Sequence, residues 1–317
     1  MFFIKFFITF IILFIFWISI IFFQSANPTK SSQWIYDVYN KKTNIANNIQ
    51  KEKVVIVAGS NALFGINSKM LSDAFNKPVV NYSVNAGLLL PYILYKAKKI
   101  LKKGDIVILP LEYSMYNYNG LASTQMIDYI FSRDFDAFYT LSFLEQFYMI
   151  WNVSFKRLYD GYNFSEDKKI TTGLYGPHNI NEFGDQLQNS LKYKSKAFTN
   201  QLDNYKAKTY GREYNEKALS WIYLKEFNSW CKENDIRCIF IPGAFMKYES
   251  YFTDEKERWF YENISKIAIK KGMEFIGEPY DYMFKKELYF NSIYHLTSKG
   301  RDKMTQQIIS DFQSFSK

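Results

Sequence analysis

The chain has 317 residues, of which 48% are hydrophobic and 22% are charged, and this balance excludes an intrinsically disordered protein. Its net charge of +9 would suit nucleic acid, anionic lipid or an anionic polymer. The lysines are scattered, however, and no helix-turn-helix, zinc-finger or aromatic RNA-binding signature accompanies them. We therefore expect a solvated basic surface near a membrane, and no nucleic-acid partner.

An uncharged apolar stretch opens the chain. Residues 6–23 read FFITFIILFIFWISIIFF, eighteen residues that nearly span a bilayer core as a helix, and Lys5 can snorkel at one end. The stretch is longer than the apolar region of a cleaved signal peptide, and no small-x-small cleavage pattern follows it. We predict an uncleaved transmembrane signal anchor over residues 1–24. A polar stalk and a first helix are expected over residues 25–52.

Strands and helices then alternate. Strands are expected over residues 54–58, 78–84, 106–111, 237–242 and 273–276. Helices are expected over residues 68–75, 92–101, 214–231, 254–270 and 298–315. The strands are continuous apolar runs such as VVIVA and IVILPL, which are typical of a parallel sheet covered on both faces. The alternation predicts an α/β domain over residues 53–317, a flavodoxin-like three-layer α/β/α sandwich with about five parallel strands.

Residues 120–210 interrupt this alternation. The part up to about residue 160 has helical spacing and many aromatic residues, and the remainder reads as loop. We expect a middle insertion, or a cap over the sheet edge.

The cysteines and histidines give no metal signature. The chain has two of each, Cys231, Cys238, His178 and His295, and they form no closely spaced ligand pair. We expect no metal site, and nothing in the sequence indicates an organic cofactor. The two cysteines either form a disulfide or pack as small core residues, and we favour the second because a fold of this size needs no covalent staple.

Three polar segments fall where a parallel sheet of this kind binds ligands, at or beyond the carboxyl ends of its strands. Ser60 follows the first strand in AGSNALFGIN, the segment NYSVNAG follows the second strand, and His295 precedes the last helix in YFNSIYHLTSKG. Each also fits a structural role, because Ser and Asn commonly cap helices and form turns, and a histidine can be a hydrogen-bonded core residue.

Taken together, the order of these segments resembles the SGNH, or GDSL-like, hydrolase superfamily. Ala58-Gly59-Ser60 resembles its first block, and Tyr294-His295-Leu296-Thr297 resembles its last. The chain is most similar to the membrane-anchored branch that includes alginate O-acetylation and teichoic-acid D-alanylation proteins. The stretches that carry this likeness are GSNALFGIN, NYSVNAGLLL, KKGDIVILPLEY, NINEFGD and FNSIYHLTSKG. The resemblance covers about residues 53–113 and 215–315.

The chemistry that the resemblance implies is acyl transfer. Ser60 would attack an ester carbonyl while His295 takes its proton, which gives an acyl-enzyme. The oxyanion or substrate-binding groups would be the Ser60 backbone N–H together with Asn61, Ser83 and Asn85. Water as the acceptor makes the protein an esterase, and a sugar hydroxyl makes it a transferase.

The last block departs from the family pattern at the acid. An Asp commonly lies three or four residues before the His, but these positions are Ser292 and Asn291 here. Asn291 can orient the imidazole but brings no charge to stabilise an imidazolium. A carboxylate from elsewhere, such as Asp281 or Glu287, is the alternative.

The second and third blocks depart as well. Ser83 replaces the Gly of the second block, and Glu112 follows the third strand where the family has an Asn. These departures leave a Ser–His dyad and a degenerate site both open.

The orientation across the membrane rests on the resemblance. One lysine, Lys5, precedes the apolar segment and Lys30, Lys41 and Lys42 follow it, so the charges do not decide the side. The resemblance implies a single-pass protein of the cytoplasmic membrane whose domain lies on the extracytoplasmic, periplasmic side.

We therefore expect a membrane-anchored acyl esterase or O-acyltransferase that acts on cell-surface polysaccharide, with an acyl donor delivered by a membrane partner. The alternative is a catalytically degenerate relative that binds glycan or assembles a polysaccharide pathway. In that case aromatic residues such as Tyr116, Tyr118 and Tyr175 either stack on sugars or serve only in packing.

Overall fold

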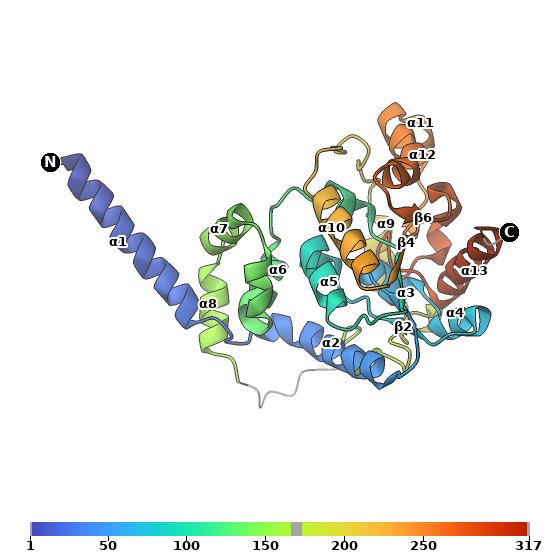
Figure 1. Ribbon diagram of the computed structural model, residues 1–317, viewed down its shortest axis with the longest axis horizontal. Coiled ribbons are helices and arrows are strands. Elements are labelled where there is room, and N and C mark those ends of the chain that lie inside the picture. The colour runs from blue at the N-terminus through green and yellow to red at the C-terminus, as the bar shows by residue number, and fades with distance from the viewer. Residues whose placement is uncertain (1, 166–172, 316–317) are drawn as a thin grey trace. The chain divides into compact units, whose positions relative to one another are not determined.

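The computed structural model describes residues 2–165 and 173–315, and Figure 1 shows their elements in chain order. The chain divides into two compact units, one of Met1–Tyr36 with Gly120–Thr172 and one of Asp37–Asn119 with Gly173–Lys317. The expected insertion is therefore shared between them. Its helical part groups with the N-terminal segment, residues 173–210 group with the α/β domain, and residues 166–172 lie outside the described residues.

The first unit is helical. It contains α1 (Phe2–Phe23), the start of α2 (Lys30–Asn48), α6 (Thr124–Arg133), α7 (Phe143–Trp151) and α8 (Phe155–Tyr162). Helix α1 is long and apolar enough to cross a membrane, which is consistent with the predicted anchor. Serines at the N-caps of α6, α7 and α8 each accept a hydrogen bond from a backbone N–H in the first turn, which fixes where these helices begin.

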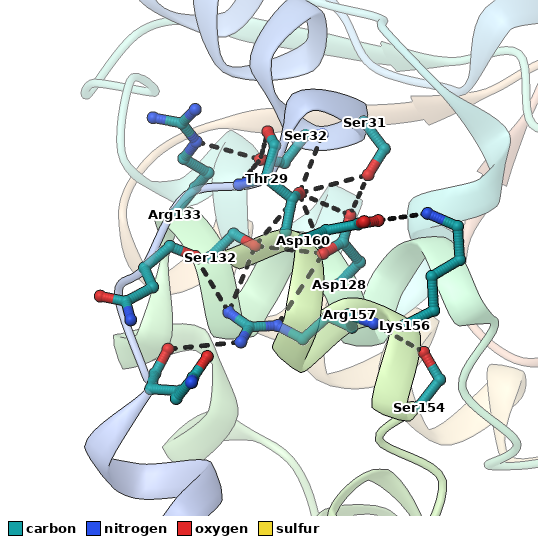
Figure 2. Close-up of polar contacts among 12 residues, drawn as sticks. Thr29, Ser31, Ser32, Asp128, Ser132, Arg133, Ser154, Lys156, Arg157 and Asp160 are labelled. Carbon is teal, nitrogen blue, oxygen red and sulfur yellow. Dashed lines mark hydrogen bonds and ion pairs between the residues drawn. The ribbon is translucent and has the colours of Figure 1, made fainter. Parts of the chain in front are cut away.

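A buried polar cluster closes the inner side of this unit (Figure 2). Arg157 of α8 donates to the backbone carbonyls of Gln24 and Asn27, in the segment that directly follows α1. Its guanidinium also lies 3.9 Å from Asp128 of α6, whose carboxylate accepts a hydrogen bond from Thr29. The cluster thus joins α6 and α8 to the segment that directly follows α1.

The second unit contains the sheet that the sequence predicts. Its five strands are all parallel and run in the order β2-β1-β3-β4-β6, which is the flavodoxin-like order. The strands are β1 (Val54–Ile56), β2 (Val79–Asn81), β3 (Ile106–Leu109), β4 (Arg237–Phe240) and β6 (Glu274–Phe275). The predicted α/β fold is confirmed, and each strand lies inside the range expected for it.

Helices cover both faces of this sheet. Helix α13 packs on α3 and α4 on one side, whereas α10 packs on α5 and β4 on the other, as right-handed crossovers require. These helices are α3 (Ser60–Gly65), α4 (Ser68–Phe75), α5 (Leu89–Lys98), α10 (Ser220–Glu233), α12 (Glu255–Lys270) and α13 (Ser298–Phe315). Helix α10 begins later than expected because Ser220 bonds to the backbone carbonyls of Tyr116 and Tyr118, which holds the preceding segment out of the helix.

Smaller elements complete the second unit. The sequence did not predict the short parallel pair β5 (Phe245–Met246) and β7 (Met283–Phe284), since two-residue strands carry no periodicity. Two further helices are α9 (Lys196–Asp203) and α11 (Ser250–Thr253). The 3-10 helices of the chain are η1 (Ala86–Leu88), η2 (Tyr113–Asn117), η3 (Phe135–Thr140), η4 (Pro177–Asn179), η5 (Leu191–Tyr193), η6 (Pro279–Tyr282) and η7 (Lys286–Leu288).

Much of the aromatic content lies in the core of the second unit. Tyr116 and Tyr118 are 1% and 6% exposed, so they pack inside the domain and present no face to a sugar. Cys231 and Cys238 are both buried and form no disulfide, so they are core residues, as expected.

Candidate functional site

The candidate nucleophile lies at the carboxyl edge of the sheet. Strand β1 ends at Ile56, and the chain turns through Gly59 into α3, whose first residue is Ser60. Ser60 is partly exposed, and the other five residues of α3 are all buried. The short helix is thus anchored in the core and presents its first side chain, which is the placement that a nucleophile needs.

The backbone around His295 is held in one conformation. The Ser292 hydroxyl accepts hydrogen bonds from the backbone N–H groups of Tyr294 and His295, and the Phe290 N–H donates to the His295 carbonyl over 2.7 Å. This tight loop immediately precedes α13 and fixes the direction in which the imidazole leaves the backbone.

Asn291 sets the tautomer of the imidazole. Its side-chain oxygen lies 2.7 Å from His295 Nδ1. Because an amide oxygen only accepts hydrogen bonds, Nδ1 carries the proton and Nε2 keeps its lone pair. The predicted role of Asn291 as the orienting residue agrees with this contact. Neither Asp281 nor Glu287 bonds to His295 in the described part of the chain, and both carboxylates are exposed.

The His295 ring lies flat on helix α3. Its centroid is 4.3 Å from that of Phe64, and the two ring planes differ by 8°. Phe64 follows Ser60 by four residues, so the two side chains occupy the same face of the helix. The fold therefore brings His295 to the face of α3 that begins with Ser60. No hydrogen bond joins Ser60 to His295 among the described residues, and neither Ser60 Oγ nor His295 Nε2 bonds to any other described group.

Burial governs the titration of His295. The ring is 8% exposed, and desolvation lowers the pKa of His295 to about 3. The imidazole is therefore neutral, in the form that accepts a proton. Asn291 carries no charge that would stabilise the imidazolium, so protonation at this position is costly.

Tyr175 completes the surroundings of the imidazole. Its hydroxyl hydrogen-bonds to Asn291, and burial raises the pKa of Tyr175. The Tyr175 ring also meets the His295 ring edge-on, with centroids 6.4 Å apart. Tyr175 therefore lies at the site as a neighbour of the orienting Asn291, a role that the sequence did not reveal.

Glu112 holds the turn that carries Ser60. Its buried carboxylate accepts hydrogen bonds from the N–H groups of Gly59 and Asn61, each over 3.1 Å. Burial raises the pKa of Glu112 to about 7. A Cβ on Gly59 would lie 2.4 Å from a Glu112 oxygen and 2.6 Å from the Cα of Ala86, so only glycine fits there. The departure that the sequence shows after the third strand is thus a positioning group for the nucleophile turn.

The predicted oxyanion and substrate-binding groups fall into two sets. The Asn61 side-chain amide donates to the Pro110 carbonyl over 2.6 Å, and the Ser83 hydroxyl donates to the Ile56 carbonyl over 3.3 Å. Both are used within the fold. The Asn85 side-chain oxygen accepts from the Gly87 N–H, whereas its amide nitrogen and the Ser60 backbone N–H have no partner in the described ranges. These two donors are the ones still available to a developing oxyanion.

A buried lysine supports the loop after β2. Lys42 is 0% exposed, and its ammonium donates to the Ser83 carbonyl over 2.5 Å. Desolvation lowers the pKa of Lys42 to about 7, and the negative charge of Asp185 opposes this shift in part. Asp185, from the stretch NINEFGD, accepts hydrogen bonds from Ser68 and from Asn81 at the end of β2. No local sequence pattern marks Lys42, because burial of a lysine is decided by long-range packing.

No group of three or more potential metal ligands occurs within the described residues. His178 lies on the surface, where its ring contacts the Gly173 carbonyl. No protein-family model and no curated protein matches the chain.

Proposed function

We propose that this chain is a membrane-anchored acyl esterase or O-acyltransferase, with Ser60 as nucleophile and His295 as base. The observation that carries the proposal is the arrangement of the imidazole. Asn291 fixes its tautomer, and the ring stacks on the helix that begins with Ser60. Both reacting groups are free of other bonds in the described structure, as a nucleophile and its base must be before substrate binds.

The proposed reaction has two steps. Ser60 Oγ attacks the ester carbonyl while His295 Nε2 takes the hydroxyl proton, and the resulting oxyanion is held by the Ser60 N–H and the Asn85 amide. The imidazolium then returns its proton to the departing alcohol, which leaves an acyl-Ser60. In the second step water or a sugar hydroxyl attacks this ester and gives its proton to His295, which passes the proton to the departing Ser60 Oγ.

The substrate side of the proposal comes from the sequence resemblance. We place the domain on the extracytoplasmic side of the cytoplasmic membrane, where α1 would hold it close to nascent surface polysaccharide. An acyl donor would be delivered by a membrane partner. The apolar helix α1 is consistent with membrane anchoring.

One set of observations favours the alternative, a non-catalytic glycan-binding or assembly protein. The pKa of His295 is lowered to about 3, the orienting residue is uncharged, and the side chains of Asn61 and Ser83 are bonded within the fold. A base that accepts a proton so reluctantly lowers the rate of acyl transfer.

Hydrolysis of p-nitrophenyl acetate by the full chain in detergent distinguishes the acyl-transfer enzyme from the non-catalytic protein. We expect Ser60→Ala and His295→Ala each to lower the rate by about 10²–10⁴-fold, the range that general-base and nucleophilic catalysis supply. The matched controls are Ser314→Ala and His178→Ala, a surface serine and a surface histidine, which should keep the wild-type rate.

Mass spectrometry of the reaction mixture adds a second readout. An acyl group on Ser60 that is absent from His295→Ala supports the mechanism even when the final acceptor is missing. A wild-type chain that neither turns over nor becomes acylated would contradict catalysis and support the binding protein.

A further inference from the structure

Helices α7 and α8 pack against the apolar helix α1 inside the first unit. The rings of Phe147 and Trp151 on α7 lie 6.1 and 6.5 Å from that of Phe14. Trp17 meets Phe155 of α8 edge-on at 5.3 Å, and its indole N–H donates to the Ile150 carbonyl over 3.2 Å. The contacts fall on the C-terminal half of α1.

These contacts determine how deep α7 and α8 would lie in a bilayer that α1 spans. At 1.5 Å per helical residue, Trp17 and Phe14 lie about 9 and about 14 Å in from the Phe23 end of α1. Helices that lie in a membrane interface are buried about 5–10 Å below the headgroups. If α1 spans a bilayer, the parts of α7 and α8 that touch it therefore lie at acyl-chain depth.

The outward faces of both helices are apolar and aromatic. Helix α7 exposes Phe143 by 79%, Phe147 by 46% and Trp151 by 57%, at a spacing of four residues. Leu144 lies beside them and is 77% exposed. Phe147 and Trp151 contact Phe14 with one part of their rings and remain about half exposed, so this stripe of α7 is largely uncovered by the described protein.

Helix α8 repeats the pattern. Phe155, Tyr159 and Tyr162 are 80%, 70% and 79% exposed, again along one face. The inward face carries Arg157, whose bonds to the Gln24 and Asn27 carbonyls fix α8 at the exit of α1 (Figure 2). Large aromatic side chains are seldom exposed in such number on a soluble surface, and Trp and Tyr are the residues enriched at membrane interfaces.

An apolar groove joins the two surfaces. It has a volume of about 440 Å³ and is lined only by apolar side chains, among them Phe10 and Leu13 of α1, Trp151, Val153 and Phe155. A groove of this kind at the flank of a membrane helix matches the chemistry of a lipid acyl chain.

We propose that α7 and α8 form a second membrane element, an aromatic hairpin seated in the acyl-chain region of the leaflet next to the Phe23 end of α1. The occupant of its exposed face is the lipid bilayer, because that face continues the surface of α1 at the same depth. The inference rests on the anchoring by α1 in the proposed function and is independent of the Ser60 chemistry.

Spin labels on the full chain in lipid vesicles test the depth. A nitroxide is placed at Phe143→Cys, Phe155→Cys or Tyr159→Cys in a background with the buried Cys231 and Cys238 changed to Ala. Collision with oxygen, which concentrates in lipid, is compared with collision with a water-soluble nickel chelate. The membrane reference is Leu13→Cys on α1. The water reference is Ile222→Cys on α10, an apolar residue that is 54% exposed.

We expect the oxygen-to-nickel accessibility ratio at the three hairpin positions to match that of Leu13→Cys and to exceed that of Ile222→Cys several-fold. Ratios like that of Ile222→Cys, with Leu13→Cys in lipid, would overturn the hairpin and leave the anchor intact. Low accessibility to both reagents would show that a protein surface covers the face, which also overturns the proposal. Water-like behaviour at Leu13→Cys would instead contradict the anchor itself, and the hairpin with it.

Discussion

The two edges of the central sheet differ in how fully their polar side chains are bonded. At the amino edge, Asp105 accepts hydrogen bonds from the Lys53 ammonium over 2.5 Å, from the Lys53 N–H over 3.0 Å and from the Lys102 N–H over 2.8 Å. At the carboxyl edge, Ser60 Oγ and His295 Nε2 have no bond within the described residues. The polar groups named at the amino edge bond to one another, whereas these two at the carboxyl edge are unbonded in the described structure.

This difference distinguishes polar groups that stabilise the fold from polar groups that remain available to a ligand. A buried donor or acceptor without a partner costs about 1–3 kcal/mol, so a fold retains one where a ligand or water completes it. Two side-chain oxygens near the site, those of Asn61 and Asn189, are among the buried atoms that have no partner in the described part of the chain, whereas the Lys53 ammonium and the Asp105 carboxylate bond to each other. Variants of the bonded Lys53–Asp105 pair should therefore change stability, and variants of the unbonded Ser60 and His295 should change chemistry.

The largest effect is expected at the amino edge. Lys53→Ala leaves the Asp105 carboxylate buried without its countercharge, and we expect a loss of about 3–5 kcal/mol in the free energy of unfolding, measured by urea denaturation. The matched control is Lys69→Ala, which breaks the exposed pair with Asp73 and should cost less than about 1 kcal/mol. Equal losses in the two variants would show that burial does not distinguish this edge.

Glu112 should make stability depend on pH at the carboxyl edge. Its pKa is about 7 in the folded chain and 4.5 as the reference, so the folded state holds this proton more tightly. The stability that it contributes is therefore full below pH 4.5, falls as the pH rises from 4.5 to 7 and is constant above that. The decline amounts to about 3 kcal/mol, at about 1.4 kcal/mol for each pH unit.

The contribution of Glu112 is measured by comparing how the free energy of unfolding changes with pH in the wild type and in two variants. Glu112→Gln removes the titration and should flatten the slope between pH 4.5 and 7. Ser60→Ala, in the same turn, has no titrating group to lose and should keep the wild-type slope. A Gln variant with an unchanged slope would mean that the carboxylate is ionised throughout this range.

The smallest effect concerns the rate. Asn291→Asp places a carboxylate beside His295 Nδ1, which raises the pKa of His295 and stabilises the imidazolium that forms during acyl transfer. We expect kcat/KM for p-nitrophenyl acetate to rise by about 10²-fold, less than the roughly 10⁴-fold that the opposite change costs a serine protease. The acid limb of the pH–rate profile should move upward from about pH 3.

Asn291→Ala serves as the partner variant, because it removes the orienting oxygen without adding charge. It should lower kcat/KM, so the Asp and Ala variants should deviate from wild type in opposite directions. If both leave the rate unchanged, the imidazole takes no part in turnover.

The candidate site shows which of its residues can be predicted from local sequence and which cannot. Ser60 and His295 were found because each lies next to a recognisable element in a segment that resembles a family block, and Asn291 because it holds a position where that family commonly has an Asp. The buried Lys42 and the contact of Tyr175 with Asn291 could not be found in this way. Both depend on side chains that are distant in sequence, and a lysine near a membrane segment reads as a surface charge.

The sequence by itself determined the apolar N-terminal helix and the parallel sheet, because continuous apolar runs and their alternation with helical spacing are local properties. Only the tertiary structure decided that residues 120–165 belong with that helix and not with the sheet, since helices of either kind carry the same spacing. It also decided which polar groups at the carboxyl edge are bonded and which are free. Hydrogen-bond partners are set by packing between segments that are distant in the sequence, and no local pattern of residues predicts that packing.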